Sequence, residues 1–362
     1  MGVTISRGRQ LPIGVDLGST AAKLLQLRQS EDRVELLAAA TVEIPPPLRA
    51  DRDKRLAHLA GEIRRAVKTC GFRGTTAVLS LPAEETFVHH VRIPKTSGEI
   101  DAAVRAELDG KLPYPVSQAI VRHVVAGDVL GGSEPRQEVI TVSTWRRGLE
   151  GYLNMARRAH LDVVAVNIES CAVVECFARL FRRDSDAART ILFVDIGQRT
   201  TQAVLSHGSR IVFARNLNIG GEQFDQAVAE AESIDVAEAN ARRRAIQDAE
   251  EDQTPPEADR LYSHLEVPIT ETVDQLNQCL RYYESVFRGQ SIERAIFVGG
   301  QARDKRLCQE IARRLNLPAQ IGDPLTRITR AAGSPEVALD MRHVQPDWAV
   351  AVGLSLGTGQ AA

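Results

Sequence analysis

The first eighty residues alternate between short apolar runs and turn residues. Apolar residues dominate 11–19, 23–27 and 34–42, and this pattern predicts three consecutive strands that pair as a meander. Three prolines and a charged stretch then end the meander. Apolar residues recur at helical spacing from 56 to 67, which predicts a helix, and a buried strand is predicted at 76–81.

A unit with a different pattern interrupts this first half. We expect a compact α+β insert over about 84–161. Its predicted elements are a strand at 87–93, a helix at 97–112, strands at 119–125 and 138–143, and a helix at 149–159. A strand at 163–166, a helix at 168–180 and a polar linker at 184–188 follow.

The opening pattern then returns. Strands are predicted at 191–196, 202–206, 211–218 and 295–300, and helices at 222–245, 276–287, 305–315 and 348–356. The acidic, proline-bearing stretch 248–259 is predicted to be a mobile loop. We therefore expect a basic tail at 1–12 and two related α/β halves, 13–183 and 189–362, that form a cleft. The last predicted helix, 348–356, returns to the first half.

Composition narrows the class of protein. The 45 Lys and Arg residues nearly balance the 47 Asp and Glu residues, and aromatic residues make up 4%, so a surface that coats nucleic acid is not expected. Five scattered cysteines without a Cys-x-x-Cys pair argue against a disulfide framework and fit a reducing cytoplasm. The sequence lacks an apolar run of about 18 residues and an N-terminal signal peptide, so we expect a soluble protein.

Two Asp-x-Gly turns carry the candidate chemistry. Asp16-Leu17-Gly18 and Asp195-Ile196-Gly197 each lie between two predicted strands. A glycine turn lets backbone N–H groups point at an anion, and the preceding Asp can hold a hydrated Mg²⁺. One such motif is ordinary turn chemistry. Two copies, each between strands, favour a phosphate site.

Two glycine pairs precede predicted helices. Gly220-Gly221 follows one predicted strand, and Gly299-Gly300 forms the end of another. Such a pair allows a flat base or a ribose to lie against the backbone, and a helix N-terminus favours anions. Each pair alone fits a plain strand–loop–helix connection equally well.

Taken together, these motifs resemble the actin/Hsp70/sugar-kinase ATPase fold. Within that fold the chain is most similar to the PilM family of type IV pilus assembly, itself similar to FtsA. The matching stretches lie at 13–23, 111–115, 194–197, 218–224, 298–300 and 349–354. The resemblance implies duplicated ribonuclease H-like α/β halves with a small α+β insert in the first half.

The resemblance also implies a site for ATP and Mg²⁺. Asp16 and Asp195 would face the Mg²⁺ shell, and Glu169 would lie near the attacking water as the catalytic residue. The remaining nucleotide-binding positions would be Gly18, Ser19, Thr20, Lys23, Gly197, Thr200, Gly220, Gly221, Glu238, Gly299 and Gly300.

The chain departs from the family pattern at several of these places. Ser170 replaces the proline after the catalytic Glu, Gln198-Arg199 stand where small residues are commoner, and Gln301 replaces a third glycine. A family lysine is lost after Glu238 unless Arg242 substitutes for it. We therefore expect ATP binding with weak or no hydrolysis by the chain alone.

The resemblance further implies a scaffold at the cytoplasmic face of the inner membrane. Its partner would be the N-terminal cytoplasmic tail of a PilN-like inner-membrane protein, in a groove between the insert and the first half. The strand at 87–93 and the loop at 112–114 are the expected walls. Two alternatives stay open: a small-molecule (sugar-type) kinase with the same cleft, and a component of a related type II secretion platform.

Two other groups of residues are not assigned to a functional site. His89 and His90 are neighbours in a predicted strand, so their side chains face opposite sides and cannot share a metal. The run of three arginines at 242–244 is interpreted as the solvated face of a helix.

Overall fold

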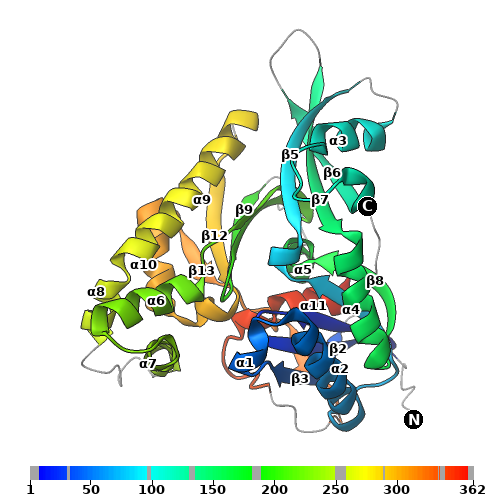
Figure 1. Ribbon diagram of the computed structural model, residues 1–362, viewed down its shortest axis with the longest axis vertical. Coiled ribbons are helices and arrows are strands. Elements are labelled where there is room, and N and C mark those ends of the chain that lie inside the picture. Colours follow the sequence, from blue (N-terminus) through cyan, green and yellow to red (C-terminus); the bar gives the residue numbers. More distant parts are fainter. Residues whose placement is uncertain are drawn as a thin grey trace, which may run out of the picture.

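A computed structural model describes most of the chain (Figure 1). The described residues are 8–30, 33–95, 99–129, 135–181, 189–248, 258–287, 290–332, 334 and 339–357. The predicted linker 184–188, most of the predicted acidic loop 248–259 and the first seven residues of the predicted tail lie outside these residues.

The first half is built on a six-stranded sheet with the order β14-β3-β2-β1-β4-β8. Its strands are β1 (Arg9–Leu17), β2 (Ala21–Gln29), β3 (Val34–Glu43), β4 (Thr76–Leu81), β8 (Asp162–Ile168) and β14 (Ile328–Arg330). The first three form the predicted antiparallel meander, and β4 and β8 continue the sheet in parallel. Helices α2 (Arg52–Thr69) and α4 (Arg146–Arg158) bury their apolar stripes on one face of this sheet.

The second half repeats this order of strands. Its sheet runs β11-β10-β9-β12-β13, with an antiparallel meander followed by parallel strands. The strands are β9 (Thr190–Ile196), β10 (Thr201–His207), β11 (Arg210–Leu217), β12 (Ile292–Val298) and β13 (Ala319–Ile321). Helices α6 (Gly221–Glu232), α9 (Glu266–Val286) and α10 (Lys305–Leu315) cover its outer face. The predicted fold class, a duplicated α/β unit, is confirmed.

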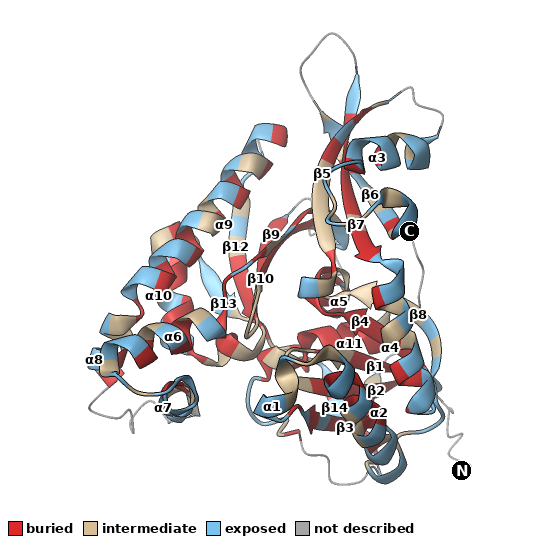
Figure 2. Cartoon of the chain, in the orientation of Figure 1, coloured by how far each residue is buried: buried red, intermediate tan, exposed pale blue. Residues whose placement is uncertain are grey.

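Two helices lie between the sheets. Helices α5 (Glu169–Ala178) and α11 (Ala349–Leu356) share a buried cluster with residues of both sheets, and Figure 2 shows α11 buried. They approach so closely that a Cβ on Gly353 would lie 1.8 Å from the carbonyl oxygen of Ala172. The predicted return of the last helix to the first half is confirmed. The N-termini of both helices lie at the cleft.

The insert is a three-stranded sheet covered by one helix. The strands β5 (Phe87–Pro94), β6 (Ala119–Val129) and β7 (Arg136–Trp145) have the order β5-β7-β6, and α3 (Ile100–Leu108) packs on one face. The other face meets the second half, where the ring of His90 stacks on Phe213 with 4.7 Å between centroids. Helix α4, although within the range predicted for the insert, packs on the first half.

The predicted single helix at 222–245 is wrong. Two helices, α6 and α7 (Val236–Asp248), replace it, because Ser233 adopts a left-handed conformation with φ 54° and ends α6. Helix α8 (Ala258–His264) begins where the acidic loop was predicted to end. The short strand β14, which joins the first sheet from the second half, carries no signal in the local sequence pattern.

Candidate functional site

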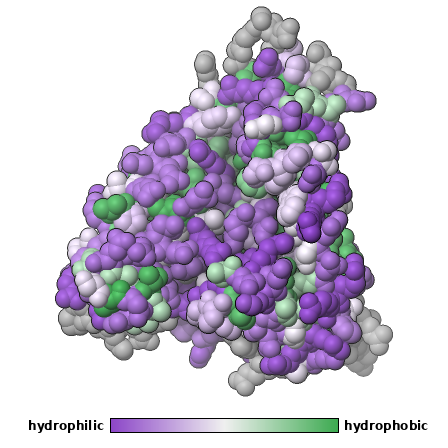
Figure 3. Space-filling view, viewed as in Figure 1, coloured by the Kyte–Doolittle hydropathy of each residue, from purple (hydrophilic) through white to green (hydrophobic). Residues whose placement is uncertain are grey.

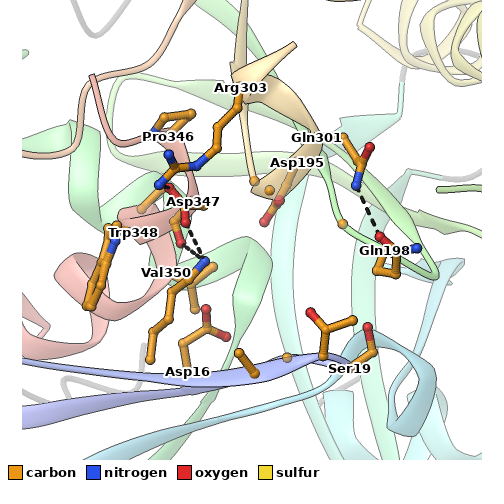
Figure 4. Close-up of a pocket in the computed structure, with 18 of the residues that line it drawn as sticks. Asp16, Ser19, Asp195, Gln198, Gln301, Arg303, Pro346, Asp347, Trp348 and Val350 are labelled. Carbon is orange, nitrogen blue, oxygen red and sulfur yellow. Dashed lines mark hydrogen bonds and ion pairs between the residues drawn. The ribbon is translucent and has the colours of Figure 1, made fainter. Parts of the chain in front are cut away.

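The two Asp-x-Gly hairpins border one cavity of about 530 Å³ between the halves (Figure 4). Most of the predicted site residues lie around it. Those that line it are Asp16, Gly18, Ser19, Thr20, Lys23, Glu169, Asp195, Gly197, Thr200, Gly299 and Gly300. Gly220, Gly221 and Glu238 do not line this cavity.

Two carboxylates enter the cavity from opposite halves (Figure 4). Asp16 lies near the end of β1, where the hydroxyl of Ser80 donates a hydrogen bond of 3.3 Å to its carboxylate. Burial raises the pKa of Asp16 to about 6. Burial and the nearby charge of Asp16 raise the pKa of Asp195 to about 7. Two carboxylates that repel each other in a half-buried site are stabilised by an added cation.

A third carboxylate, Glu169, begins α5 beside them. Burial, followed by the charges of Asp16 and Asp195, raises its pKa well above the ordinary value. The side-chain amide of Gln202 on β10 donates to Glu169, and the hydroxyl of Ser170 donates to Gln202. Ser170, the departure from the family's proline, thus connects the start of α5 to the second half.

An ion-pair cluster, which the sequence analysis missed, closes one side of the cavity. Asp347 in the short helix η6 (Pro346–Trp348) accepts from Lys23 at 2.9 Å and from Arg303 at 2.9 Å. Although burial acts to raise it, Lys23 and then Arg303 hold the pKa of Asp347 below the ordinary value. The local signal was an Asp directly before a predicted apolar helix.

The turn after β12 brings backbone close to Asp195. Gly299 has φ 90°, and a Cβ there would lie 2.2 Å from a carboxylate oxygen of Asp195. Its N–H donates to the carbonyl of Pro346 at 3.1 Å. A side chain at this position would both strain the backbone and fill the space beside Asp195.

A buried polar network supports the second hairpin from behind. Arg243 is 2% exposed and bonds Asp225 at 2.6 Å and the side-chain oxygen of Gln301 at 2.7 Å. Gln198 donates to Asp225 at 2.7 Å and accepts from Gln301 at 3.1 Å. The interpretation of 242–244 as a solvated face is therefore wrong for Arg243. The two glutamines that depart from the family pattern belong to this network.

Gly220 and Gly221 lie beneath the same hairpin. A Cβ on Gly220 would come within 2.8 Å of the carbonyl oxygen of Gly197, and one on Gly221 within 2.5 Å of the side chain of Gln198. Their small size lets helix α6 start directly against the hairpin. In this structure they shape the hairpin and do not contact the cavity.

Helix α7 presents different residues to the cavity from those predicted. Glu238 and Arg242 pair with each other on its outer side, and Arg242 also pairs with Glu232. Arg244 and Gln247 line the cavity instead. The sequence motif located the correct helix but not the face of that helix that meets the cavity.

The carboxylates suit a hydrated cation better than direct ligation. Among the described residues, no group of three His, Cys, Asp or Glu side chains could hold a metal ion. Mg²⁺ commonly keeps several waters and uses one or two carboxylates together with substrate phosphates. Asp16 and Asp195 fit that role, because both line the cavity and a nearby cation would offset the burial that disfavours their ionised forms.

The surface in view is mostly hydrophilic, with small separate hydrophobic patches (Figure 3). In the parts of the chain that the structure describes, no helix combines the length and the apolar character needed to cross a bilayer.

Comparisons with known proteins identify the family. The family model for type IV pilus assembly protein PilM matches residues 14–358. The chain is similar in structure to a PilM–PilN type IV pilus biogenesis complex, with 22% identity, a TM-score of 0.77 and coverage of 95% of this chain and 97% of that one. It is also similar to the ethanolamine utilization protein EutJ from Carboxydothermus hydrogenoformans, with 15% identity, a TM-score of 0.56 and coverage of 96% and 89%. The chain therefore belongs to the PilM family of type IV pilus assembly proteins.

Proposed function

We propose that this chain is a scaffold of the type IV pilus assembly platform at the cytoplasmic face of the inner membrane. It binds Mg-ATP in the cleft between its halves and docks the N-terminal cytoplasmic segment of a PilN-like membrane protein. The observation that carries this proposal is the family match over residues 14–358, nearly the whole chain.

The lining of the cavity supports nucleotide binding. The turns at Gly18 and Gly197 supply backbone N–H donors, and Ser19, Thr20 and Thr200 add hydroxyls. Lys23 supplies a positive charge at the same place. A bound Mg²⁺ would neutralise phosphate charge, and Asp16 and Asp195 would hold its water shell.

Hydrolysis by the chain alone is expected to be slow. A general base must be ionised at the working pH, whereas the pKa of Glu169 lies well above its ordinary value. Gln202 also occupies an oxygen of this carboxylate. The site therefore favours binding over turnover.

Part of the expected wall of the docking groove is engaged in contacts within the insert. Tyr114 packs edge-on against Phe87 with 5.7 Å between ring centroids, and the partly buried Tyr114 lies against the core of the insert. We place the partner instead at β8, the last strand of the first sheet among the described residues. Val164 in this strand is 59% exposed, and Trp145, the last residue of β7 directly before α4, is 36% exposed. An extended peptide can add its backbone to such an edge while apolar side chains fill neighbouring pockets.

The test is a titration of a synthetic N-terminal segment of the PilN-like protein from the same organism, with and without Mg-ATP. We expect binding to the wild-type chain and weaker binding to Val164→Glu. Val267→Glu is the matched control, because Val267 is 75% exposed on α9 in the second half. Undetectable binding under both conditions contradicts the scaffold proposal, and equal binding by both variants contradicts the β8 location.

A further inference from the structure

Arg199, at the tip of the second hairpin, has two loosely held ion-pair partners among the residues that the structure describes. Its Nη1 lies 3.6 Å from a carboxylate oxygen of Glu84 in the first half, and its Nε lies 3.8 Å from Glu222. Both distances are longer than a hydrogen bond. The side chain is 35% exposed and lines the cavity. Arg199 thus lies on the proposed phosphate-binding turn, and its guanidinium N–H groups make no short hydrogen bond to Glu84 or Glu222.

Positive charge gathers at this end of the cleft. Arg244 on α7 also lines the cavity, and Arg49 ends α1 (Pro46–Arg49), which faces α7 in Figure 1. Burial and the charge of Arg244 lower the pKa of Arg49, with a smaller contribution from Arg199, although the nearby Glu43 acts to raise it. An anion bound here would relieve this repulsion between guanidinium groups.

We propose that Arg199 binds the terminal phosphate of the nucleotide. When it does so, its ion pair with Glu84 breaks. The inference rests on the proposed nucleotide site. Arg199 lies two residues beyond Gly197, on the turn that borders the phosphates in that proposal. A guanidinium forms strong, paired hydrogen bonds with phosphate oxygens, which its present partners do not provide.

The release of Glu84 connects the phosphate to the insert. Glu84 belongs to the turn η1 (Ala83–Glu85), which leads directly into β5. The side chain of Asn216 on β11 donates to the carbonyls of Ala83 and Thr86, so the second half is hydrogen-bonded to this turn. Arg55 in the first half lies 3.9 Å from Glu84. Once its ion pair with Arg199 is broken, Glu84 pairs with Arg55. A terminal phosphate thus weakens one of the links between the second half and the start of the insert.

The test compares Mg-ATP with Mg-ADP by calorimetry. Arg199→Ala is expected to weaken ATP binding about 10- to 100-fold, the range of a charge-assisted hydrogen bond, and to leave ADP binding nearly unchanged. Arg199→Lys should recover part of the loss. Glu84→Gln should strengthen ATP binding, because it removes the competing carboxylate. Arg242→Ala is the matched control, since Arg242 lies on the outer side of α7.

The outcomes separate this inference from the proposed function. If the wild-type chain binds ATP but Arg199→Ala binds it equally well, or loses ATP and ADP alike, Arg199 does not bind the terminal phosphate and only this inference fails. If the wild-type chain binds neither nucleotide, the nucleotide site itself is wrong. Melting curves of each variant show whether a lost affinity comes from lost folding.

Discussion

The ammonium nitrogen of Lys23 lies 2.9 Å from the carboxylate of Asp347 and 2.7 Å from the backbone carbonyl of the same residue. Lys23 comes from β2 in the first sheet, whereas Asp347 directly precedes Trp348 and the last helix. Arg303, from the turn after β12 in the second half, shares the same carboxylate. One largely buried Asp therefore links the first sheet, the second half and the N-terminus of α11 beside the cleft.

The first prediction concerns this link. Asp347→Asn should lower the free energy of unfolding by about 2–4 kcal/mol near pH 7, because it leaves two partly buried cations without their shared carboxylate. The pKa of Asp347 is depressed in the folded chain, so its contribution is present above the unfolded pKa and is lost as the pH falls through the folded pKa. Urea unfolding at pH 7 and below pH 4 measures the difference. An unchanged midpoint at pH 7 contradicts the prediction.

The second prediction concerns the two cleft carboxylates. Their folded pKa values, about 6 for Asp16 and about 7 for Asp195, exceed the ordinary value of 3.8. The folded chain therefore binds more protons than the unfolded chain between about pH 4 and 7. As the pH rises through that window, the contribution of these two carboxylates to the free energy of unfolding falls. Asp195→Asn should stabilise the empty protein at pH 8 by roughly 1–2 kcal/mol, allowing for solvent screening in the open cleft.

Unfolding curves of the wild type and Asp195→Asn between pH 4 and pH 8 measure this contribution. The two curves should converge at the acidic end. A variant that is less stable than the wild type at pH 8 would show that Asp195 is stabilised by its surroundings.

The third prediction separates neighbouring arginines. Arg243→Ala should destabilise the chain by about 3–5 kcal/mol, because it leaves Asp225 buried without its cation. Arg242→Ala, on the exposed side of the same helix, should change stability by less than about 0.5 kcal/mol. Guanidinium unfolding of both variants provides the measurement. Similar small effects would mean that the Arg243 network contributes little.

The fourth prediction concerns the packing of α11 on α5. Gly353→Ala should destabilise by several kcal/mol, since its Cβ would lie 1.8 Å from the Ala172 carbonyl and the backbones must separate. Gly61→Ala is the matched control: Gly61 lies within α2 with nothing within 4 Å of its Cβ position. Alanine there should stabilise by about 0.5–1 kcal/mol. Thermal unfolding of both variants distinguishes a packing effect from a general effect of alanine.

The sequence predicted those parts of the fold that local patterns determine. The hairpins at Gly18 and Gly197 follow from apolar runs around a turn, and the strand at 76–81 agrees in both bounds with β4. Strand β14 could not be predicted, because its three residues are held by pairing with β3, far away in the chain. The position of Ser233 carries neither Gly nor Pro, but Asp235, which caps α7 by accepting from the backbone of Glu238, was a local signal that the prediction did not use.

The residues of the candidate site also fall into two groups, those that local sequence patterns locate and those that depend on tertiary packing. Asp16 and Asp195 are marked by their turns, so sequence alone located them. Asp347 and Arg243 owe their roles to partners brought close by tertiary packing. In the sequence, Arg243 is one of three consecutive arginines, and periodicity does not separate it from the other two. Its buried ion pair with Asp225 is what distinguishes it in the structure.

The most direct test of the central claim, a cleft that binds Mg-ATP between its two hairpins, is calorimetric titration of the wild type and Asp195→Asn with Mg-ATP at pH 8. We predict one site on the wild-type chain and a strong loss of affinity in the variant, although the variant is the more stable protein when empty. At 100 times the Kd, the wild type should gain about 2.7 kcal/mol of stability, which appears as a melting shift of a few degrees. Absence of heat and of a melting shift with millimolar Mg-ATP, or equal affinity in both proteins, would contradict this account.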